Sequence, residues 1–345
     1  MQRIAMIGFG NVGQGLAEIL LRKKAELKRQ QGYSFAVVAV SDVKLGSVYH
    51  PDGLNLQRLL AALREKGSLE AYRGAGVVKG WDALRTIKES NVDTVVELAW
   101  TDLATGQPAI KHCEAALKAG KHVVTSNKGP AALAYPKLSR LAARHGAQLR
   151  IEGTVMSGTP VLNLGLQDLA GNRFEAVEGI LNGTTNYILS EMEAGADYAA
   201  ALAKAQSLGY AEADPTGDVE GIDAAGKVAI LANLLMGGAL TPADVKRKGI
   251  TKITAADVAK AKADGKRWKL IGSVKRSASG GLDARVQPVA LPLSDPLAAV
   301  MGPTNAVSFT TDLLGKVTMV GPGAGRVETG FAILSDLLAI DRSRA

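Results

Sequence analysis

Five carboxylates, one phenol and one lysine are concentrated between Ala205 and Lys227. The acidic side chains are Glu212, Asp214, Asp218, Glu220 and Asp223, and Tyr210 precedes them. Carboxylates can bind the ammonium group of a small substrate, and a lysine can protonate an oxygen that becomes negative during a reaction. Asp223 and Lys227 are four residues apart, so a helix would present them on one face. The same residues also fit a solvated acidic loop followed by an ordinary helical ion pair, and composition does not decide between the two.

A second lysine, Lys128, follows a short apolar strand predicted over residues 121–125. Its neighbours, Ser126-Asn127 and Gly129-Pro130, predict a tight turn. In a parallel α/β sheet, ligands bind outside the carboxyl ends of the strands. We therefore expect Lys128 to have a functional role rather than to be an incidental surface lysine.

The chain begins with a pattern that indicates dinucleotide binding. An apolar strand over residues 3–8 leads into a glycine-rich turn and then a long helical pattern, and the turn consists of Gly8, Phe9, Gly10, Asn11, Val12 and Gly13. The glycines permit the tight turn, the approach of a pyrophosphate and close packing of helix on strand, and the helix N-terminus faces the phosphates. We expect all six residues to bind the cofactor.

Residues after the second strand bear on the choice of cofactor. The strand predicted over 35–40 ends near Asp42, and an acid there can bind the ribose hydroxyls of NAD. Lys44 stands two residues further on and could meet the 2′-phosphate of NADP. Both are candidate cofactor-binding residues, and the choice between NAD and NADP stays open.

The rest of the first half alternates between helices and strands, as a doubly wound sheet requires. We predict helices over 55–66, 82–89, 108–119 and 135–145, and strands over 92–98 and 147–152. Ala99, Trp100 and Thr101 follow the strand over 92–98, which places them near the cofactor. The alternative is a turn with a packed tryptophan.

The pattern changes at residues 153–160, where glycines and small hydroxyl residues indicate a hinge or a backbone-lined pocket. A helix over 161–170, a strand over 174–181, a helix over 221–236 and three strands over 268–275, 283–290 and 306–311 predict an α+β second domain. Residues 182–186 offer amides and hydroxyls that could hold a substrate carboxylate, or simply cap a helix. A glycine-rich turn at 321–325 and a helix over 329–340 could return the chain to the first domain.

Composition narrows the class of protein. A chain of 345 residues with 47% hydrophobic and 21% charged residues fits about two soluble globular domains. The single cysteine, Cys113, excludes an intrachain disulfide and lies in a helical pattern that predicts burial. No signal peptide or membrane span is visible, so we expect a cytoplasmic protein with no membrane partner. The net charge of +8 is scattered among acids, and no nucleic-acid-binding module accompanies it.

Together these motifs resemble the signature of homoserine dehydrogenase. The gapped pattern runs through Gly209-Tyr210-Ala211, Asp214-Pro215, Asp218-Val219, Gly221, Asp223 and Lys227. The family's other segments occur in the expected order: GFGNVG at 8–13, TSNKG at 125–129, EGTVMSGTP at 152–160, GILNGTTNYIL at 179–189 and GPGAG at 321–325. The resemblance covers nearly the whole chain. Many members carry a C-terminal regulatory ACT domain, and this chain resembles the short form without one.

The resemblance implies an α/β fold with an N-terminal Rossmann-type dinucleotide-binding domain, residues 1–152 completed by 321–345. An α+β domain for substrate binding and dimerisation spans 153–320. It implies NAD(P)-dependent interconversion of L-homoserine and L-aspartate 4-semialdehyde, a step towards threonine and methionine, by a homodimer. Lys128 and Lys227 would be the catalytic pair, Gly323 would contact the cofactor, and the amino-acid site would consist of Gly183, Thr184, Tyr210, Glu212, Asp218 and Asp223. Some relatives bind sodium through backbone oxygens, here those of Glu152, Val155, Ser157 and Thr159.

Other classes of protein share some of these features. Another two-domain amino-acid dehydrogenase would share the glycine loop and the two-domain organisation. A fragment of a bifunctional aspartate kinase is less favoured, because no kinase-like segment precedes the first strand. A non-catalytic NAD(P)-binding sensor would need the glycine loop but neither lysine, and a nucleic-acid binder would rest on the net charge alone.

Overall fold

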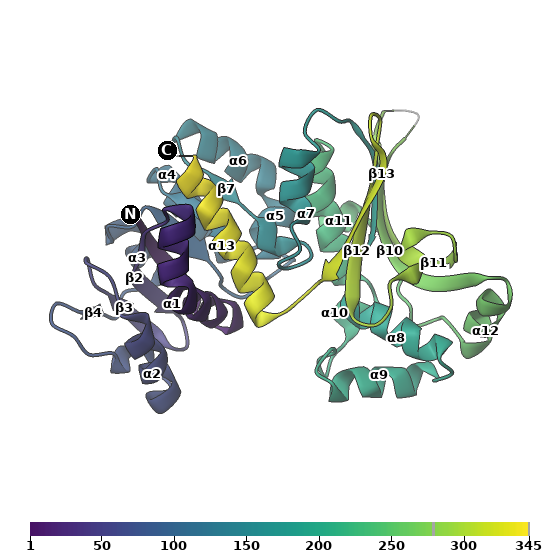
Figure 1. The fold of residues 1–345 in the computed structure, drawn as a ribbon, viewed down its shortest axis with the longest axis horizontal. Helices are drawn as coiled ribbons and strands as arrows, with labels where there is room; N and C mark the ends of the chain where they lie inside the picture. Colours follow the sequence, from purple (N-terminus) through teal and green to yellow (C-terminus); the bar gives the residue numbers. More distant parts are fainter. Residues whose placement is uncertain (278–279, 344–345) are drawn as a thin grey trace. The chain divides into compact units, whose positions relative to one another are not determined.

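The computed structural model describes residues 1–277 and 280–343, which form two compact units (Figure 1). Unit 1 comprises Met1–Gly158 and Gly325–Ala345, and unit 2 comprises Thr159–Ala324. The boundaries expected from the sequence, after residues 152 and 320, lie a few residues earlier in each case. Unit 1 therefore combines the N-terminal half of the chain with its last segment.

Unit 1 is built on a seven-stranded sheet in the order β4-β3-β2-β1-β5-β6-β7. Strands β1, β2, β5, β6 and β7 are parallel, whereas β3 and β4 extend the sheet in antiparallel fashion beyond β2. The strands are β1 (Gln2–Ile7), β2 (Phe35–Asp42), β3 (Gly46–Tyr49), β4 (Val78–Lys79), β5 (Thr94–Glu97), β6 (His122–Thr125) and β7 (Leu149–Arg150). The reversal of strand order beside β1 places the turn after β1 at the ligand-binding edge of such sheets.

Helices connect these strands and cover the sheet. They are α1 (Asn11–Gln31), α2 (Leu56–Lys66), α3 (Ala83–Glu89), α4 (Ala109–Lys118), α5 (Lys128–Leu133), α6 (Tyr135–Arg144) and α13 (Arg326–Arg342). Their ends carry ordinary capping signals. Gly32 adopts a left-handed conformation with φ +64° and ends α1, while the Asn55 side chain accepts a hydrogen bond from the Arg58 N–H at the start of α2. Cys113 on α4 is fully buried, as the sequence predicted.

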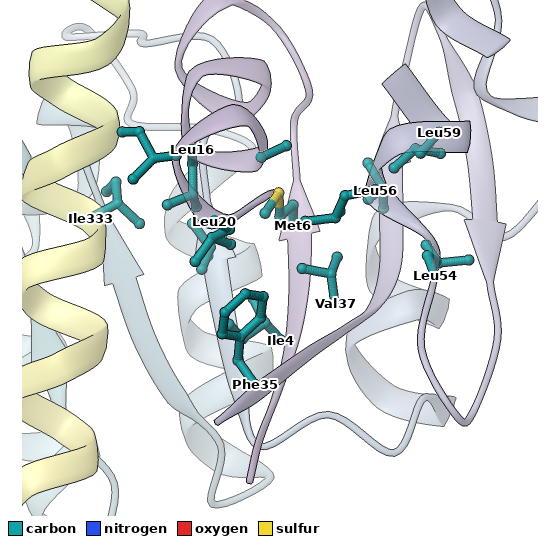
Figure 2. Packing of buried hydrophobic residues seen from close by; sticks show 14 of the residues in the cluster. Ile4, Met6, Leu16, Leu20, Phe35, Val37, Leu54, Leu56, Leu59 and Ile333 are labelled. Atoms are coloured by element: carbon teal, nitrogen blue, oxygen red, sulfur yellow. The ribbon is translucent and has the colours of Figure 1, made fainter. Parts of the chain in front are cut away.

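The core of unit 1 joins residues from both ends of the chain. Ile4 and Met6 of β1 pack with Leu16 and Leu20 of α1, and Ile333 of α13 belongs to the same buried cluster (Figure 2). Two glycines let the helices approach closely. A β-carbon on Gly330 would lie 2.9 Å from the Leu16 nitrogen, and one on Gly15 would overlap the Arg326 carbonyl. The prediction that the last helix returns to the first domain is confirmed.

Unit 2 is built on a six-stranded mixed sheet in the order β13-β12-β8-β10-β11-β9. All neighbouring pairs are antiparallel except β11 and β9. The strands are β8 (Phe174–Ile180), β9 (Lys246–Arg247), β10 (Lys266–Arg276), β11 (Leu282–Pro292), β12 (Thr304–Thr311) and β13 (Gly315–Pro322). The loop between β10 and β11 contains residues 278 and 279, which lie outside the described residues.

Helices α8, α11 and α12 pack against β10 of this sheet. The helices of unit 2 are α7 (Val161–Asn163), α8 (Gly183–Glu193), α9 (Tyr198–Ser207), α10 (Thr216–Val219), α11 (Ile222–Leu235) and α12 (Ala255–Ala263). A π-helical turn over Leu164–Asp168 continues α7. Gly272 on β10 lets α11 approach, since a β-carbon there would lie 2.8 Å from Val228 Cγ2.

Three local predictions were wrong. Residues 128–133 form a short helix, α5, whereas the sequence predicted a tight turn around Lys128; Asn127 caps that helix by accepting a hydrogen bond from the Gly129 N–H. The strand expected over 147–152 is only two residues long. Gly321 and Pro322, expected in a turn, end strand β13. None of the helices in the described part of the chain combines the length and apolar character needed to cross a membrane.

Candidate active site

The glycine-rich turn of unit 1 has the geometry that a phosphate-binding loop requires. Gly8 has φ +95°, and a β-carbon there would overlap the Leu98 carbonyl; one on Gly13 would lie 2.9 Å from the Gly8 oxygen. Gly10, by contrast, faces open space, with no atom of the described chain within 4 Å of a β-carbon built on it. No acidic residue lies in the first turn of α1. The positive end of this helix is therefore available to an anion such as a pyrophosphate.

The Asp42 carboxylate is held beside this turn. One of its oxygens accepts a hydrogen bond from the Phe9 N–H at 2.8 Å, and the other accepts from the N–H groups of Lys44 at 2.8 Å and Leu45 at 3.1 Å. The carboxylate thus ties the glycine loop to the end of β2. The Lys44 side chain is exposed nearby.

The carboxyl ends of β5 and β6 are joined by a buried hydrogen-bond network. Glu97 is fully buried, accepts from the Ala99 N–H at 3.2 Å and lies 3.3 Å from His112 Nδ1. Thr125 Oγ1 donates to the Glu97 carbonyl at 2.7 Å and accepts from the Asn127 N–H at 2.9 Å. The sequence did not single out Glu97, because it reads as part of an apolar strand.

Asn127 connects that network to two candidate site segments. Its side-chain nitrogen donates to the carbonyls of Ala99 at 3.0 Å and Trp100 at 3.2 Å, while its side-chain oxygen caps the helix that Lys128 begins. Trp100 is 63% exposed, so its interpretation as a packed tryptophan is wrong. Thr101 is exposed as well.

In unit 2, an amide, two carboxylates and a lysine form one cluster. Asn182 Nδ2 donates to Asp218 Oδ1 at 2.7 Å and to Asp223 Oδ2 at 3.2 Å. Lys227 Nζ donates to the same Asp223 oxygen at 2.7 Å and to the Leu181 carbonyl at 2.5 Å. The spacing of Asp223 and Lys227 on one face of α11 is therefore realised as a direct ion pair, in which both side chains are largely buried.

Burial raises the pKa of the Asp218 carboxyl above its ordinary value, and the neighbouring Asp223 charge adds to this shift. The Asn182 hydrogen bond and the Lys227 charge act in the opposite direction. Two carboxylates held together beside one lysine make a concentrated negative site that favours a cationic group. Such a site suits the ammonium of an amino acid.

The remaining residues expected at the amino-acid site are distributed around this cluster. Thr184 Oγ1 donates to the Tyr210 carbonyl at 2.5 Å, and the Tyr210 ring lies 5.0 Å from that of Tyr187, with 41% of Tyr210 exposed. Gly183 and Thr184 open α8, directly after Asn182. Glu212 is exposed, and Gln206 Nε2 donates to its backbone carbonyl at 3.1 Å, so the structure does not bring its carboxylate into the cluster.

Asn182 is a functional candidate that the sequence analysis included only as part of the segment 182–186. Its carbonyl oxygen Oδ1 accepts from the Thr185 N–H at 2.9 Å and so caps α8. The sequence offered either a helix cap or a ligand-binding segment at 182–186. Asn182 itself caps the helix with its oxygen and orders the acidic cluster with its nitrogen.

The segment expected to bind sodium has an unusual backbone. Met156 and Ser157 have φ of 56° and 53°, a left-handed conformation that is costly for residues with side chains. Asp336, which is buried on α13, accepts from the Glu152 N–H at 2.9 Å, and Ser157 Oγ lies 2.7 Å from Thr329 Oγ1. Within the described ranges, no group of three acidic, histidine or cysteine side chains could hold a metal ion. Sodium binding through the carbonyls of Glu152, Val155, Ser157 and Thr159 stays a prediction.

A parallel sheet with a glycine-rich turn at the head of α1, and a separate α+β unit with an acid–lysine cluster, define a two-domain dehydrogenase that uses a nicotinamide dinucleotide. Comparison with known families makes the identification specific. Residues 8–152 match the model of the NAD-binding domain of homoserine dehydrogenase, and residues 160–338 match the model of homoserine dehydrogenase itself. The chain belongs to the homoserine dehydrogenase family, and it is an NAD(P)-dependent oxidoreductase.

Individual relatives agree over nearly the full length. The chain is 46% identical over 343 residues to the NAD(+)-dependent homoserine dehydrogenase of Pseudomonas canavaninivorans, covering 99% of this chain and 96% of the relative. The crystal structure of a proposed homoserine dehydrogenase from Archaeoglobus fulgidus matches with a TM-score of 0.89 at 40% identity, over 99% of both chains. A hyperthermophilic archaeal homoserine dehydrogenase solved with NADPH matches with a TM-score of 0.84 at 29% identity, over 99% of this chain and 98% of that one.

Proposed function

We propose that this protein interconverts L-homoserine and L-aspartate 4-semialdehyde by hydride transfer, with NAD(+) as its preferred cofactor. The observation that carries the proposal is the cluster of Asn182, Asp218, Asp223 and Lys227 in unit 2. Carboxylates recognise the substrate ammonium, and a lysine on the same helical face can act on the oxygen that changes charge. A non-catalytic dinucleotide sensor would need neither group.

In this mechanism the bound dinucleotide supplies the hydride or accepts it. During reduction of the aldehyde, negative charge develops on its oxygen, and the Lys227 ammonium stabilises that charge and donates a proton. Asp223 and the Leu181 carbonyl hold Lys227 Nζ in one position, so the proton is delivered from a fixed point. In the reverse direction, the substrate hydroxyl returns a proton to the lysine.

Lys128 and the residues around the acidic cluster would bind and position the substrate. Lys128 begins α5 at the carboxyl end of β6, where the buried Glu97–Thr125–Asn127 network fixes its backbone; we assign it to positioning substrate and cofactor. The cluster of Asp218 and Asp223 binds the substrate ammonium, together with the backbone of Gly183 and Thr184 and with Tyr210. Glu212 joins this set only if its exposed segment moves.

Asp42 supports the preference for NAD(+). Its carboxylate is fixed by three backbone N–H groups beside the glycine loop, so its negative charge would oppose the 2′-phosphate of NADP. The Pseudomonas relative, which is named as NAD(+)-dependent, points the same way. Lys44 is the competing feature, since its exposed ammonium could partly offset that charge.

Further parts of the proposal rest on family membership. We infer a cytoplasmic homodimer that acts in threonine and methionine biosynthesis. Sodium would bind to backbone oxygens of the 152–159 segment, whose hard carbonyl donors suit such an ion.

The test is the appearance of NADH or NADPH absorbance at 340 nm with L-homoserine and either NAD(+) or NADP(+). The purified protein should reduce NAD(+) in a homoserine-dependent reaction. Lys227→Met should lose at least about a hundredfold in kcat, because general acid–base groups contribute roughly 10²–10⁴. Lys246→Met, an exposed lysine of unit 2, is the matched control and should retain wild-type kcat. Wild-type turnover by Lys227→Met would exclude the assigned role.

A further inference from the structure

Asn305 is a polar side chain that is buried in unit 2. It lies at the start of β12 and is 1% exposed. Among the described residues, Asn305 Nδ2 and Oδ1 are both buried without a hydrogen-bond partner. Leaving a buried donor and a buried acceptor unsatisfied costs free energy, and such groups in native structures call for an explanation.

Glycine backbone surrounds this carboxamide. A β-carbon on Gly323 would overlap the Asn305 carboxamide, and one on Gly183 would lie 3.3 Å from Asn305 Oδ1. Asn305 also pairs with Gly321 across the β12–β13 ladder. Gly323 and Gly183 therefore place backbone rather than side chains against the amide.

The position of Gly183 connects Asn305 to the acidic cluster. Gly183 is the first residue of α8, and the residue before it, Asn182, donates to Asp218 and Asp223. The first N–H groups of a helix lack intrahelical acceptors and carry partial positive charge. The Asn305 carboxamide, with its oxygen near Gly183, thus lies beside a helix start that attracts carboxylates, one residue from a cluster that attracts ammonium groups.

We propose that Asn305 is a specificity-determining residue that contacts the head group of the amino-acid substrate. Its Nδ2 donates to the substrate carboxylate at the N-terminus of α8, and its Oδ1 accepts from the substrate ammonium. A zwitterionic amino acid offers both partners side by side, which is what the two unpartnered atoms require. This inference rests on the proposed homoserine activity, because it names a residue of that substrate site.

The test exploits opposite effects on stability and on substrate binding. Asn305→Leu removes both polar atoms and keeps the number of side-chain heavy atoms. Without ligand, its thermal midpoint should equal or exceed that of the wild type, because no existing hydrogen bond is lost. Its KM for homoserine should rise about tenfold or more, while its KM for NAD(+) stays within about twofold.

A comparison variant separates this effect from general damage. Asn172→Leu removes another carboxamide, whose oxygen also lacks a partner within residues 1–277 and 280–343, but whose nitrogen donates to the Leu169 carbonyl at 3.1 Å. It should lose stability and keep its KM for homoserine. Asn305→Asp, which places a negative charge beside the substrate carboxylate, provides a second variant and should also raise the KM for homoserine.

Several outcomes would overturn the proposal. A thermal midpoint of Asn305→Leu several degrees below the wild type, or failure of both Asn305 variants to fold, would make the carboxamide structural. An unchanged KM for homoserine, or a rise in the KM for NAD(+) instead, would show that Asn305 does not contact the substrate. These failures differ from failure of the proposed function, in which the wild type itself shows no homoserine-dependent reduction of NAD(P).

Discussion

At the scale of single residues, Asp42 serves the fold and the choice of cofactor at once. Its carboxylate accepts three backbone hydrogen bonds, including that of Phe9 in the glycine loop, and so it fixes the shape of the loop. The same fixed charge lies at the end of β2, where the adenosine ribose binds in dinucleotide folds. A phosphate on that ribose would meet a charge of its own sign.

We therefore expect the wild type to favour NAD(+) over NADP(+) by about tenfold or more in kcat/KM. Asp42→Asn should lower this ratio by about tenfold, equivalent to about 1.4 kcal/mol, because it removes the repulsive charge. The ratio cancels any damage to the loop that affects both cofactors equally. Lys44→Gln is the control and should shift the ratio towards NAD(+), since it removes a cation. An unchanged ratio in Asp42→Asn would show that Asp42 only shapes the loop.

Residue types and spacing predicted much of the candidate site. The motif in unit 2 led to Asp218, Asp223 and Lys227, which the structure joins through hydrogen bonds. The bridging Asn182 was ambiguous, because a helix cap and a ligand contact use the same residue types. Asn305 left no sequence signal at all, since only the fold brings Gly183 and Gly323 against its carboxamide.

At the scale of elements, helix α8 depends on a buried lysine for its attachment. Lys269 on β10 is fully buried, and its Nζ donates to Asn186 Oδ1 on α8 at 2.9 Å and to the Val300 carbonyl. The Asn186 nitrogen in turn donates to the carbonyls of Val300, Gly302 and Thr304. Strand, helix and the loop before β12 are therefore held at one point, close to the start of α8.

Burial lowers the pKa of Lys269 from 10.5 to about 8, and the nearby Arg267 charge adds to this shift. Since the pKa is lower in the folded state, the unfolded chain binds more protons between pH 8 and pH 10.5, and stability from this group rises with pH across that window. The full shift corresponds to about 3 kcal/mol. Below pH 8 the buried ammonium opposes folding by that amount.

The prediction is tested with Lys269→Met in urea unfolding at pH 7.5 and pH 10. The stability of the wild type relative to the variant should increase by about 2 kcal/mol between these pH values, because much of the shift lies between them. Lys275→Met, an exposed lysine on the same strand, should show a difference that does not vary with pH in this way. A constant difference for Lys269→Met would mean that Lys269 keeps its ordinary pKa.

Most long elements were predictable, and the errors have physical causes. Hydrophobic patterns decide the type of the long elements. Helix α1 is amphipathic, helix α11 is almost wholly apolar, and β1 and β5 are short apolar runs typical of buried strands. Helix α5 was missed because Gly129 and Pro130 usually mark turns, yet proline is well tolerated in the first turn of a helix. Strand β13 was missed because its outer residues are largely exposed and it lacks a clear apolar pattern. Its hydrogen-bonded pairing with β12, which the sequence does not reveal, stabilises it as a strand.

At the scale of the whole molecule, the chain folds its first unit from both ends. The core around β1 and α1 includes Ile333 of α13 (Figure 2). Leu334, Leu337 and Ile340 of the same helix belong to this core as well, although all of unit 2 separates α13 from α1 in the sequence. Such non-local packing requires a long loop to be closed before its contacts form. The nucleotide-binding unit therefore cannot complete its core until the last helix has been synthesised.

This arrangement predicts that a mutation in α13 weakens the binding unit that begins at residue 1. Ile333→Ala should lower the free energy of unfolding by about 2–5 kcal/mol, because the side chain is fully buried against Leu16 and Leu20. Because α1 carries the glycine loop at its N-terminus, NAD(+) should still protect the Ile333→Ala variant against thermal unfolding. Both the free and the NAD(+)-bound variant should unfold at lower temperatures than the wild type. Phe331→Ala, two residues away on the same helix and 49% exposed, is the matched control and should cost much less. Equal losses in the two variants would mean that α13 merely lies on the surface of unit 1, and the two ends of the chain would then fold independently of each other.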